Sequence, residues 1–224
     1  MAHLIEFETL TGEENMKKDL FLFENACKNK QKEPTLRFYA WKPACVSLGR
    51  NQNTDKINIK YCKENNIDIT RRITGGRALL HQDELTYSFI CPIAFLGSVS
   101  IQKSYEIISG ALIKGFKELE LDVDFGSKKP DTKYNYCMLL STGADLNYQN
   151  RKIVGSAQYR ANGYVLQHGS ILYTINSNHI KNIFNEDIEH KLITLSEIMP
   201  EINTNKIINA LINGFEKKFN VKFT

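Results

Sequence analysis

The segment that most restricts the fold of this chain is residues 144–173, ADLNYQNRKIVGSAQYRANGYVLQHGSILY. Alternating apolar and polar residues, with many β-branched and aromatic side chains, are typical of β-strands. Asn162-Gly163 is the dipeptide most typical of a tight two-residue hairpin turn, and Gln149-Asn150 interrupts the strand pattern earlier. We therefore predict three consecutive antiparallel strands in this segment.

On both sides of this segment, apolar residues recur at the spacing typical of helices. Apolar residues three or four positions apart predict an amphipathic helix over residues 100–119 and a closing helix over residues 207–219. A first helix is expected to follow the capping residue Thr11 and to continue to about Ala26. Further strands are expected over residues 36–41, in residues 44–52 and over residues 85–90. Helices combined with hairpins indicate an α+β fold with mixed, largely antiparallel sheets.

Length and composition set the remaining limits. At 224 residues and 42% hydrophobic content, the chain is expected to form a single domain, residues 1–224, around one core. No apolar run approaches the roughly 18 residues of a membrane span, and the first residues do not resemble a signal peptide. We expect a soluble, cytoplasmic protein without membrane association. The formal charge of +4 fits an acidic protein partner as well as nucleic acid, and the basic residues form no dense run, so charge alone does not decide between them. We expect a protein partner and no nucleic acid.

The five cysteines are an odd number, they are scattered, and they form no CxxC pair. This pattern predicts neither a disulfide framework nor a metal site. A free cysteine is most often a small buried hydrophobe, so each needs further context before it is assigned chemistry.

A glycine pair in residues 71–78, RRITGGRA, is the sharpest local feature. Gly75 and Gly76 allow the backbone to approach a ligand closely, and the neighbouring arginines and Thr74 supply hydrogen-bond donors. Such a loop suits a carbonyl or a phosphate group. The alternative is a tight turn between strands with solvated arginines.

Residues 151–158, RKIVGSAQ, form a second candidate segment. Strand alternation predicts that Lys152, Val154 and Ser156 share one face. If that face lines a pocket, Lys152 can hold an acyl carbonyl, a phosphate or a neighbouring thiolate. Cys137 lies fifteen residues earlier, and a cysteine beside a lysine would form an acyl-transfer pair. The alternatives are a lysine on a solvated face and a cysteine in the core.

Taken together, these segments resemble the lipoate and octanoate protein ligase and transferase family, which is related in fold to the biotin protein ligases. The resemblance extends in one order from residue 15 to residue 170. The matching segments are Asn15-Met16 with Asp19, Trp41 with Pro43, and residues 47–52, 71–88, 137–146, 151–158 and 166–170.

Three departures separate the branches of this family. Lipoate ligases have a triple-glycine loop, a Gly-Arg-Asn type segment and often an accessory domain. This chain has Gly75-Gly76-Arg77 and Tyr136-Cys137-Met138 at the first two places and little room for an extra domain. It therefore resembles the cysteine-dependent octanoyltransferase and lipoyl amidotransferase branch. Met138 stands where such enzymes often have phenylalanine, and Ser141 where they often have proline.

The resemblance implies an acyltransferase in which Cys137 and Lys152 are catalytic. Cys137 would take an octanoyl group from an octanoyl acyl carrier protein as a thioester, and a lysine of another protein would resolve that thioester to an amide. Amides near Gly75-Gly76 or Gly155 are candidates for holding the oxyanion. The implied substrate-binding residues are Arg71, Arg72, Thr74, Gly75, Gly76, Arg77, His81, Gly155, Ser156, Ala157 and His168.

The implied acceptors are lipoyl domains of 2-oxoacid dehydrogenases or the glycine-cleavage H protein, and no cofactor or metal is expected. Three alternatives remain at the level of sequence. They are an ATP-dependent lipoate ligase using ATP and magnesium, a lipoyl amidotransferase acting from protein to protein, and a binding module without turnover. His81 and His168 also raise the hypothesis of a Cys-His pair, in the manner of a thiol protease.

Overall fold

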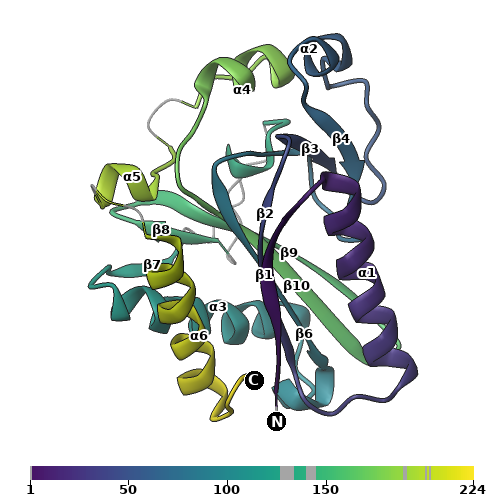
Figure 1. Cartoon of the computed structure of the whole chain (residues 1–224), viewed down its shortest axis with the longest axis vertical. Helices are drawn as coiled ribbons and strands as arrows, with labels where there is room; N and C mark the ends of the chain where they lie inside the picture. The colour runs from purple at the N-terminus through teal and green to yellow at the C-terminus, as the bar shows by residue number, and fades with distance from the viewer. Residues whose placement is uncertain (1, 127–133, 140–144, 189–190, 200, 202) are drawn as a thin grey trace.

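The computed structural model describes the whole chain except residues 1, 127–133, 140–144, 189–190, 200 and 202 (Figure 1). Its main element is a seven-stranded sheet in the order β1-β2-β6-β10-β9-β8-β7. The strands are β1 (His3–Leu10), β2 (Thr35–Trp41), β6 (Glu84–Pro92), β10 (Tyr164–Leu172), β9 (Arg151–Ala161), β8 (Leu146–Tyr148) and β7 (Val123–Phe125). All neighbours pair antiparallel except β1 and β2, which run parallel. The predicted α+β fold is confirmed.

Strand β10 is the central strand, and every one of its residues is buried. It pairs with β6 on one side and with β9 on the other. The turn between β9 and β10 places Asn162 at φ 53° and Gly163 at φ 79°, the conformation that an Asn-Gly hairpin favours. The predicted three antiparallel strands are therefore confirmed as β8, β9 and β10.

Helices cover both faces of this sheet (Figure 1). Helices α3 (Ile101–Glu118) and α6 (Thr204–Phe219) pack against each other, and their apolar residues join Phe89 and Val165 in the main core. Helix α1 (Gly12–Lys28) packs against Ile90 and Leu166, the residues that come directly after Phe89 and Val165 in β6 and β10. Successive strand residues point to opposite faces, so α1 lies across the sheet from α3 and α6. All three predicted helices are confirmed.

A three-stranded sheet of order β4-β3-β5 lies beside the main sheet, near the top of Figure 1. Its strands are β3 (Cys45–Leu48), β4 (Asp68–Arg71) and β5 (Leu79–His81), and Gly75-Gly76 lies between β4 and β5 as predicted. Its core includes residues of α2 (Ile59–Glu64), of α4 (Ser177–Phe184) and of η2 (Cys137–Leu139). The remaining elements are η1 (Ile93–Leu96) and α5 (Leu195–Ile198).

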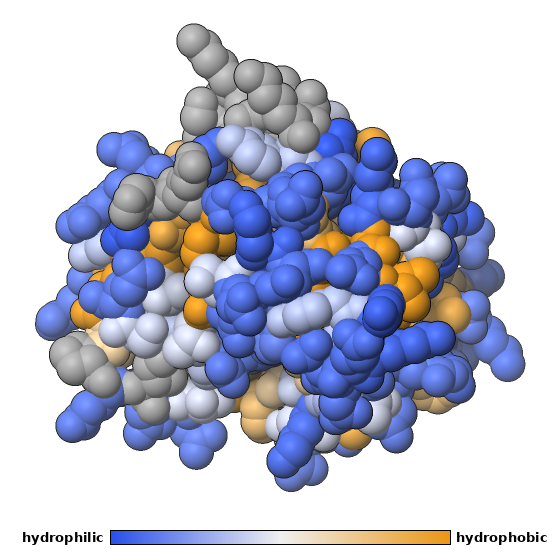
Figure 2. Space-filling view, turned by 90° about the horizontal axis from the view of Figure 1, so that it is seen from above, coloured by the Kyte–Doolittle hydropathy of each residue, from blue (hydrophilic) through white to orange (hydrophobic). Residues whose placement is uncertain are grey.

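Within the described part of the chain, no helix has the length and apolar character needed to cross a bilayer. The surface seen from above is mostly hydrophilic, with hydrophobic side chains recessed between hydrophilic ones (Figure 2).

Candidate active site

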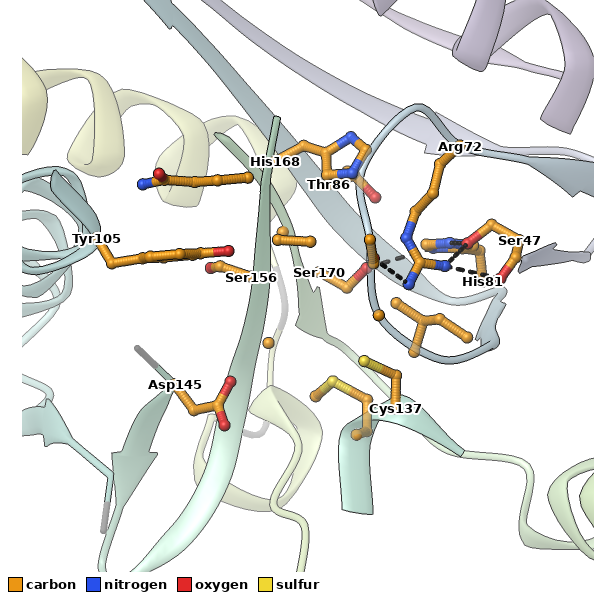
Figure 3. Close-up of a pocket in the computed structure, with 18 of the residues that line it drawn as sticks. Ser47, Arg72, His81, Thr86, Tyr105, Cys137, Asp145, Ser156, His168 and Ser170 are labelled. Atoms are coloured by element: carbon orange, nitrogen blue, oxygen red, sulfur yellow. Dashed lines mark hydrogen bonds between the residues drawn. The ribbon is translucent and has the colours of Figure 1, made fainter. Parts of the chain in front are cut away.

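A cavity of about 730 Å³ is bounded by strands β9 and β10, the loop before β5, the start of α3 and η2. Its volume falls within the usual range for sites that bind small molecules. Figure 3 shows side chains from these separate segments pointing into the same space. Ten of the residues predicted from sequence line it: Arg72, Gly75, Gly76, His81, Cys137, Lys152, Gly155, Ser156, Ala157 and His168.

Cys137 begins the short helix η2 and is half-buried at the cavity wall. Its backbone N–H donates to the carbonyl of Ala78 at 2.8 Å, which holds η2 against the loop before β5. Its Sγ lies 3.8 Å from the position a Cβ on Gly76 would occupy, and Gly76 has a φ of +95° that favours glycine. Residues 140–144 of the predicted cysteine loop lie outside the described residues.

The other cysteines have surroundings typical of core residues. Cys45, Cys62 and Cys91 are buried, and burial raises the pKa of each thiol. Cys27 is half-buried on α1, and partial burial raises the pKa of its thiol as well. None of these four lines the cavity, so Cys137 is the cysteine placed to react there.

Lys152 reaches the cavity from β9, and its side chain is only 9% exposed. Its Nζ forms an ion pair with Asp145 Oδ1 at 3.0 Å and lies 3.5 Å from the carbonyl oxygen of Cys137. The predicted common face is wrong for Val154, which packs in the main core together with Ile153. The cause is a register shift between β8 and β9, which places an extra β9 residue at this point.

The side chain of Arg72 fixes the glycine loop. One guanidinium nitrogen donates to the carbonyls of Gly75 at 3.0 Å and Arg77 at 2.7 Å. The other donates to the carbonyl of Ser47 at 2.8 Å, which ties the loop to β3. Burial lowers the pKa of Arg72, and the negative charge of a Cys137 thiolate would oppose that shift. Arg72 therefore shapes the loop beside Cys137 and adds positive charge there.

Three other predicted residues of this loop do not line the cavity. Arg71 donates to carbonyls of the loop after β3, including those of Gly49 and Gln52. Arg77 donates to the carbonyl of Tyr134. The hydroxyl of Thr74 lies 2.8 Å from Nε2 of His168, behind the wall. In this structure these side chains support the loop from outside the cavity.

His168 joins a buried polar cluster. Its Nδ1 lies 3.1 Å from Asp19 Oδ2, and the other Asp19 oxygen accepts from Arg37 at 2.8 Å. Burial lowers the pKa of His168 and outweighs the opposing effect of the Asp19 charge. A carboxylate can only accept, so the neutral ring donates from Nδ1 and accepts the hydroxyl of Thr74 at Nε2. The cluster thereby connects α1, β2 and β10 to the glycine loop.

His81 is also committed to partners. Its Nε2 lies 2.7 Å from the hydroxyl of Ser47, its Nδ1 lies 2.8 Å from Glu84, and its ring stacks on Trp41. Both ring nitrogens of His81 and of His168 thus contact groups other than Cys137. This arrangement favours structural and cavity-lining roles for the two histidines over a Cys-His pair.

The neutral state of His168 predicts an acid-sensitive stability. The unfolded chain binds a proton at this ring near pH 6.5, whereas the folded protein resists it, so stability falls as the pH drops through that range. We expect the free energy of unfolding to decrease by about 1 kcal/mol between pH 7.5 and pH 5.5 through this group. Urea unfolding of wild type and His168→Gln at both pH values measures it. An equal pH dependence in the two proteins would contradict this assignment.

Two residues of the cavity wall, Asp145 and Tyr105, show no functional pattern in the sequence. Asp145 precedes β8 and lies in residues 137–146, which resemble the family. A single acidic residue at this place does not by itself indicate a function. The helical spacing places Tyr105 on the apolar face of the helix predicted over residues 100–119, whereas in the structure Tyr105 lines the cavity. Burial raises the pKa of Tyr105 to about 12, so its phenol is a neutral hydrogen-bond donor. Helical periodicity identified the correct face and could not separate core from cavity.

Comparison with known sequences matches residues 11–216 to the Lipoyl protein ligase A/B catalytic domain. A protein named Octanoyltransferase LipM from Staphylococcus epidermidis is 35% identical over 213 residues, covering 85% of this chain and 77% of that protein. A protein of the same name from Clostridioides difficile is 33% identical, covering 98% of this chain and 88% of its own length.

Solved structures share the fold at lower identity. A lipoate-protein ligase A bound with ATP superposes with a TM-score of 0.81 at 22% identity, covering all of this chain and 87% of that one. A putative lipoate protein ligase from T. acidophilum with bound lipoic acid gives a TM-score of 0.78 at 21% identity, with the same coverage.

Proposed function

Because the chain belongs to the lipoyl protein ligase A/B catalytic-domain family, and its relatives are named octanoyltransferases, we propose that it is an octanoyl acyltransferase of lipoate biosynthesis. It moves an octanoyl group through a Cys137 thioester to a lysine of a lipoyl domain or H protein. The observation that carries the proposal is a half-buried cysteine at the wall of a cavity of about 730 Å³, beside a buried lysine.

The first half-reaction exchanges one thioester for another. Cys137 Sγ attacks the carbonyl carbon of octanoyl acyl carrier protein, an S–C bond forms, and the oxygen takes up negative charge. The bond to the carrier thiol then breaks, and the proton released by Cys137 ends on the departing sulfur. Because the donor is already an activated acyl group, this step consumes no nucleotide and needs no cofactor.

Two cationic side chains lie near Cys137. Lys152 Nζ lies 3.5 Å from the carbonyl oxygen of Cys137. Arg72 interacts electrostatically with the Cys137 thiolate. In this proposal both cations stabilise the negative charge that develops during each attack, and the backbone amides near Gly75-Gly76 or Gly155 are the candidates for holding the oxyanion. The cavity then accepts the octanoyl chain, whose methylenes each contribute about 0.8 kcal/mol when buried.

The experiment compares acyl sources directly. One reaction contains octanoyl acyl carrier protein and a lipoyl domain without ATP, and the other contains free octanoate, ATP, magnesium and the same domain. We expect an octanoylated domain from the first alone, detected by its added mass. Product from the second alone would identify an ATP-dependent ligase. An octanoylated H protein as a third donor tests protein-to-protein transfer.

A further inference from the structure

Asp145 occupies a distinctive place in the cavity. Among the described residues that line the cavity, it is the one carboxylate side chain, and it is only 4% exposed. Asp145, Cys137, Arg72 and Tyr105 come from separate segments and all line this cavity (Figure 3). Lys152 links it to the nucleophile, because its Nζ is 3.0 Å from Asp145 Oδ1 and 3.5 Å from the Cys137 carbonyl oxygen.

The acceptor in the proposed reaction brings an electrostatic difficulty to this space. A lysine amine carries a positive charge at neutral pH, and it must leave water to reach the Cys137 thioester. Lys152 and Arg72 already place positive charge there, at side chains that are almost fully buried. Like charges repel strongly in such a poorly solvated space. An acceptor lysine therefore needs a negative group near the thioester.

We propose that Asp145 is the binding subsite for the ε-ammonium group of the acceptor lysine and takes one proton from it. This inference rests on the proposed acyl transfer. It concerns the second half-reaction, in which Asp145 would make the enzyme select a cationic acceptor. Two ammonium groups, those of Lys152 and the acceptor, then share one carboxylate.

The proton count defines the step. The ammonium gives one proton to the Asp145 carboxylate, and the resulting amine attacks the thioester carbon to form a C–N bond. The C–S bond then breaks, the second nitrogen proton passes to the Cys137 sulfur, and the amide keeps the third. Asp145 returns its proton to water, so the carboxylate is restored for the next turnover.

The surrounding walls are consistent with negative charge at this point. Burial raises the pKa of Tyr105 to about 12, and the charges of Asp145 and Cys137 add to the rise. Burial likewise raises the pKa of Tyr87, with a contribution from Asp145, and the Tyr87 hydroxyl lies 2.8 Å from that of Ser156. Asp145 thus contacts Lys152 and shares the cavity with Arg72 and the neutral phenol of Tyr105. No second carboxylate among the described lining residues competes for the ammonium.

The test uses octanoyl-enzyme formed on wild type and on Asp145→Asn, which retains the shape of the side chain. Release of the octanoyl group is measured at pH 7 with two nucleophiles, a cationic lysine peptide and hydroxylamine, which is uncharged there. We expect Asp145→Asn to slow release by the lysine peptide by about 100-fold. Release by hydroxylamine should change by less than about threefold, because it needs no negative subsite.

Two control variants accompany the test. Asp145→Glu keeps the carboxylate and should recover most of the lysine rate, and Asp124→Asn removes an exposed carboxylate on β7 and should change neither rate. Equal slowing with both nucleophiles, or failure of Asp145→Asn to accept the octanoyl group, would show that Asp145 only positions Lys152 and would overturn the inference. An unchanged lysine rate would overturn it too. If wild type forms no octanoyl-enzyme, the proposed function itself fails.

Discussion

We expect replacement of Cys137 with alanine to lower the rate of octanoyl transfer from acyl carrier protein to a lipoyl domain by on the order of 10⁴-fold or more. The reason is chemical, since no other cysteine among the described residues lines the cavity and an alanine cannot form the acyl-enzyme. The rate is measured by the mass of the acceptor domain over time, without ATP.

Cys27→Ala provides the matched control, because Cys27 is also half-buried but lies on α1 away from the cavity. This variant should transfer octanoyl groups at nearly the wild-type rate. Substantial transfer by Cys137→Ala, at a rate that depends on enzyme concentration, would contradict a covalent role for Cys137 and would favour direct attack of the acceptor lysine on the donor.

The largest expected effect on stability comes from Asp19→Ala. Asp19 is buried, and its carboxylate accepts hydrogen bonds from Arg37 at 2.8 Å and Tyr39 at 2.9 Å while contacting His168. Burial alone would raise the pKa of Asp19, but His168 and Arg37 outweigh it and lower the pKa. Removing this carboxylate leaves Arg37 buried without its counter-ion. We expect the free energy of unfolding to fall by about 3–5 kcal/mol.

Guanidinium unfolding followed by circular dichroism measures this loss. Asp187→Ala removes an exposed ion pair with Lys181 instead and should change the free energy of unfolding by less than about 0.5 kcal/mol. A loss near 1 kcal/mol for Asp19→Ala would show that the cluster is replaceable by packing, and that it does not anchor α1 to β2 and β10.

Much of the fold could be predicted because its elements have strong local patterns. Helices α3 and α6 keep an apolar spacing of three to four residues, and Asn162-Gly163 fixed the turn between β9 and β10. Strand β1 was not predicted, since its pairing with β2 is parallel and depends on chain segments joined by helix α1. Residues 5–8 do alternate apolar and polar residues, but the run is short and its parallel partner lies beyond helix α1.

The candidate site was partly predictable for a different reason. A glycine pair alone is often only a turn, and a free cysteine is most often a core residue. The resemblance to the ligase and transferase family is what marked Gly75, Gly76, Cys137 and Lys152 before their positions were known. The role proposed for Asp145 could not be predicted in this way. It depends on a 3.0 Å contact between Asp145 and Lys152, which lie at a register shift between β8 and β9. Strict alternation also misplaced Val154 for that reason.

The most direct test of a covalent, nucleotide-free transfer is the intact mass of the protein after mixing with octanoyl acyl carrier protein in the absence of ATP. We predict that wild type gains the mass of one octanoyl group, that hydroxylamine removes it, and that Cys137→Ala gains none. A wild-type protein that stays unmodified with this donor, yet octanoylates a lipoyl domain when ATP and free octanoate are supplied, would contradict the account and identify a ligase.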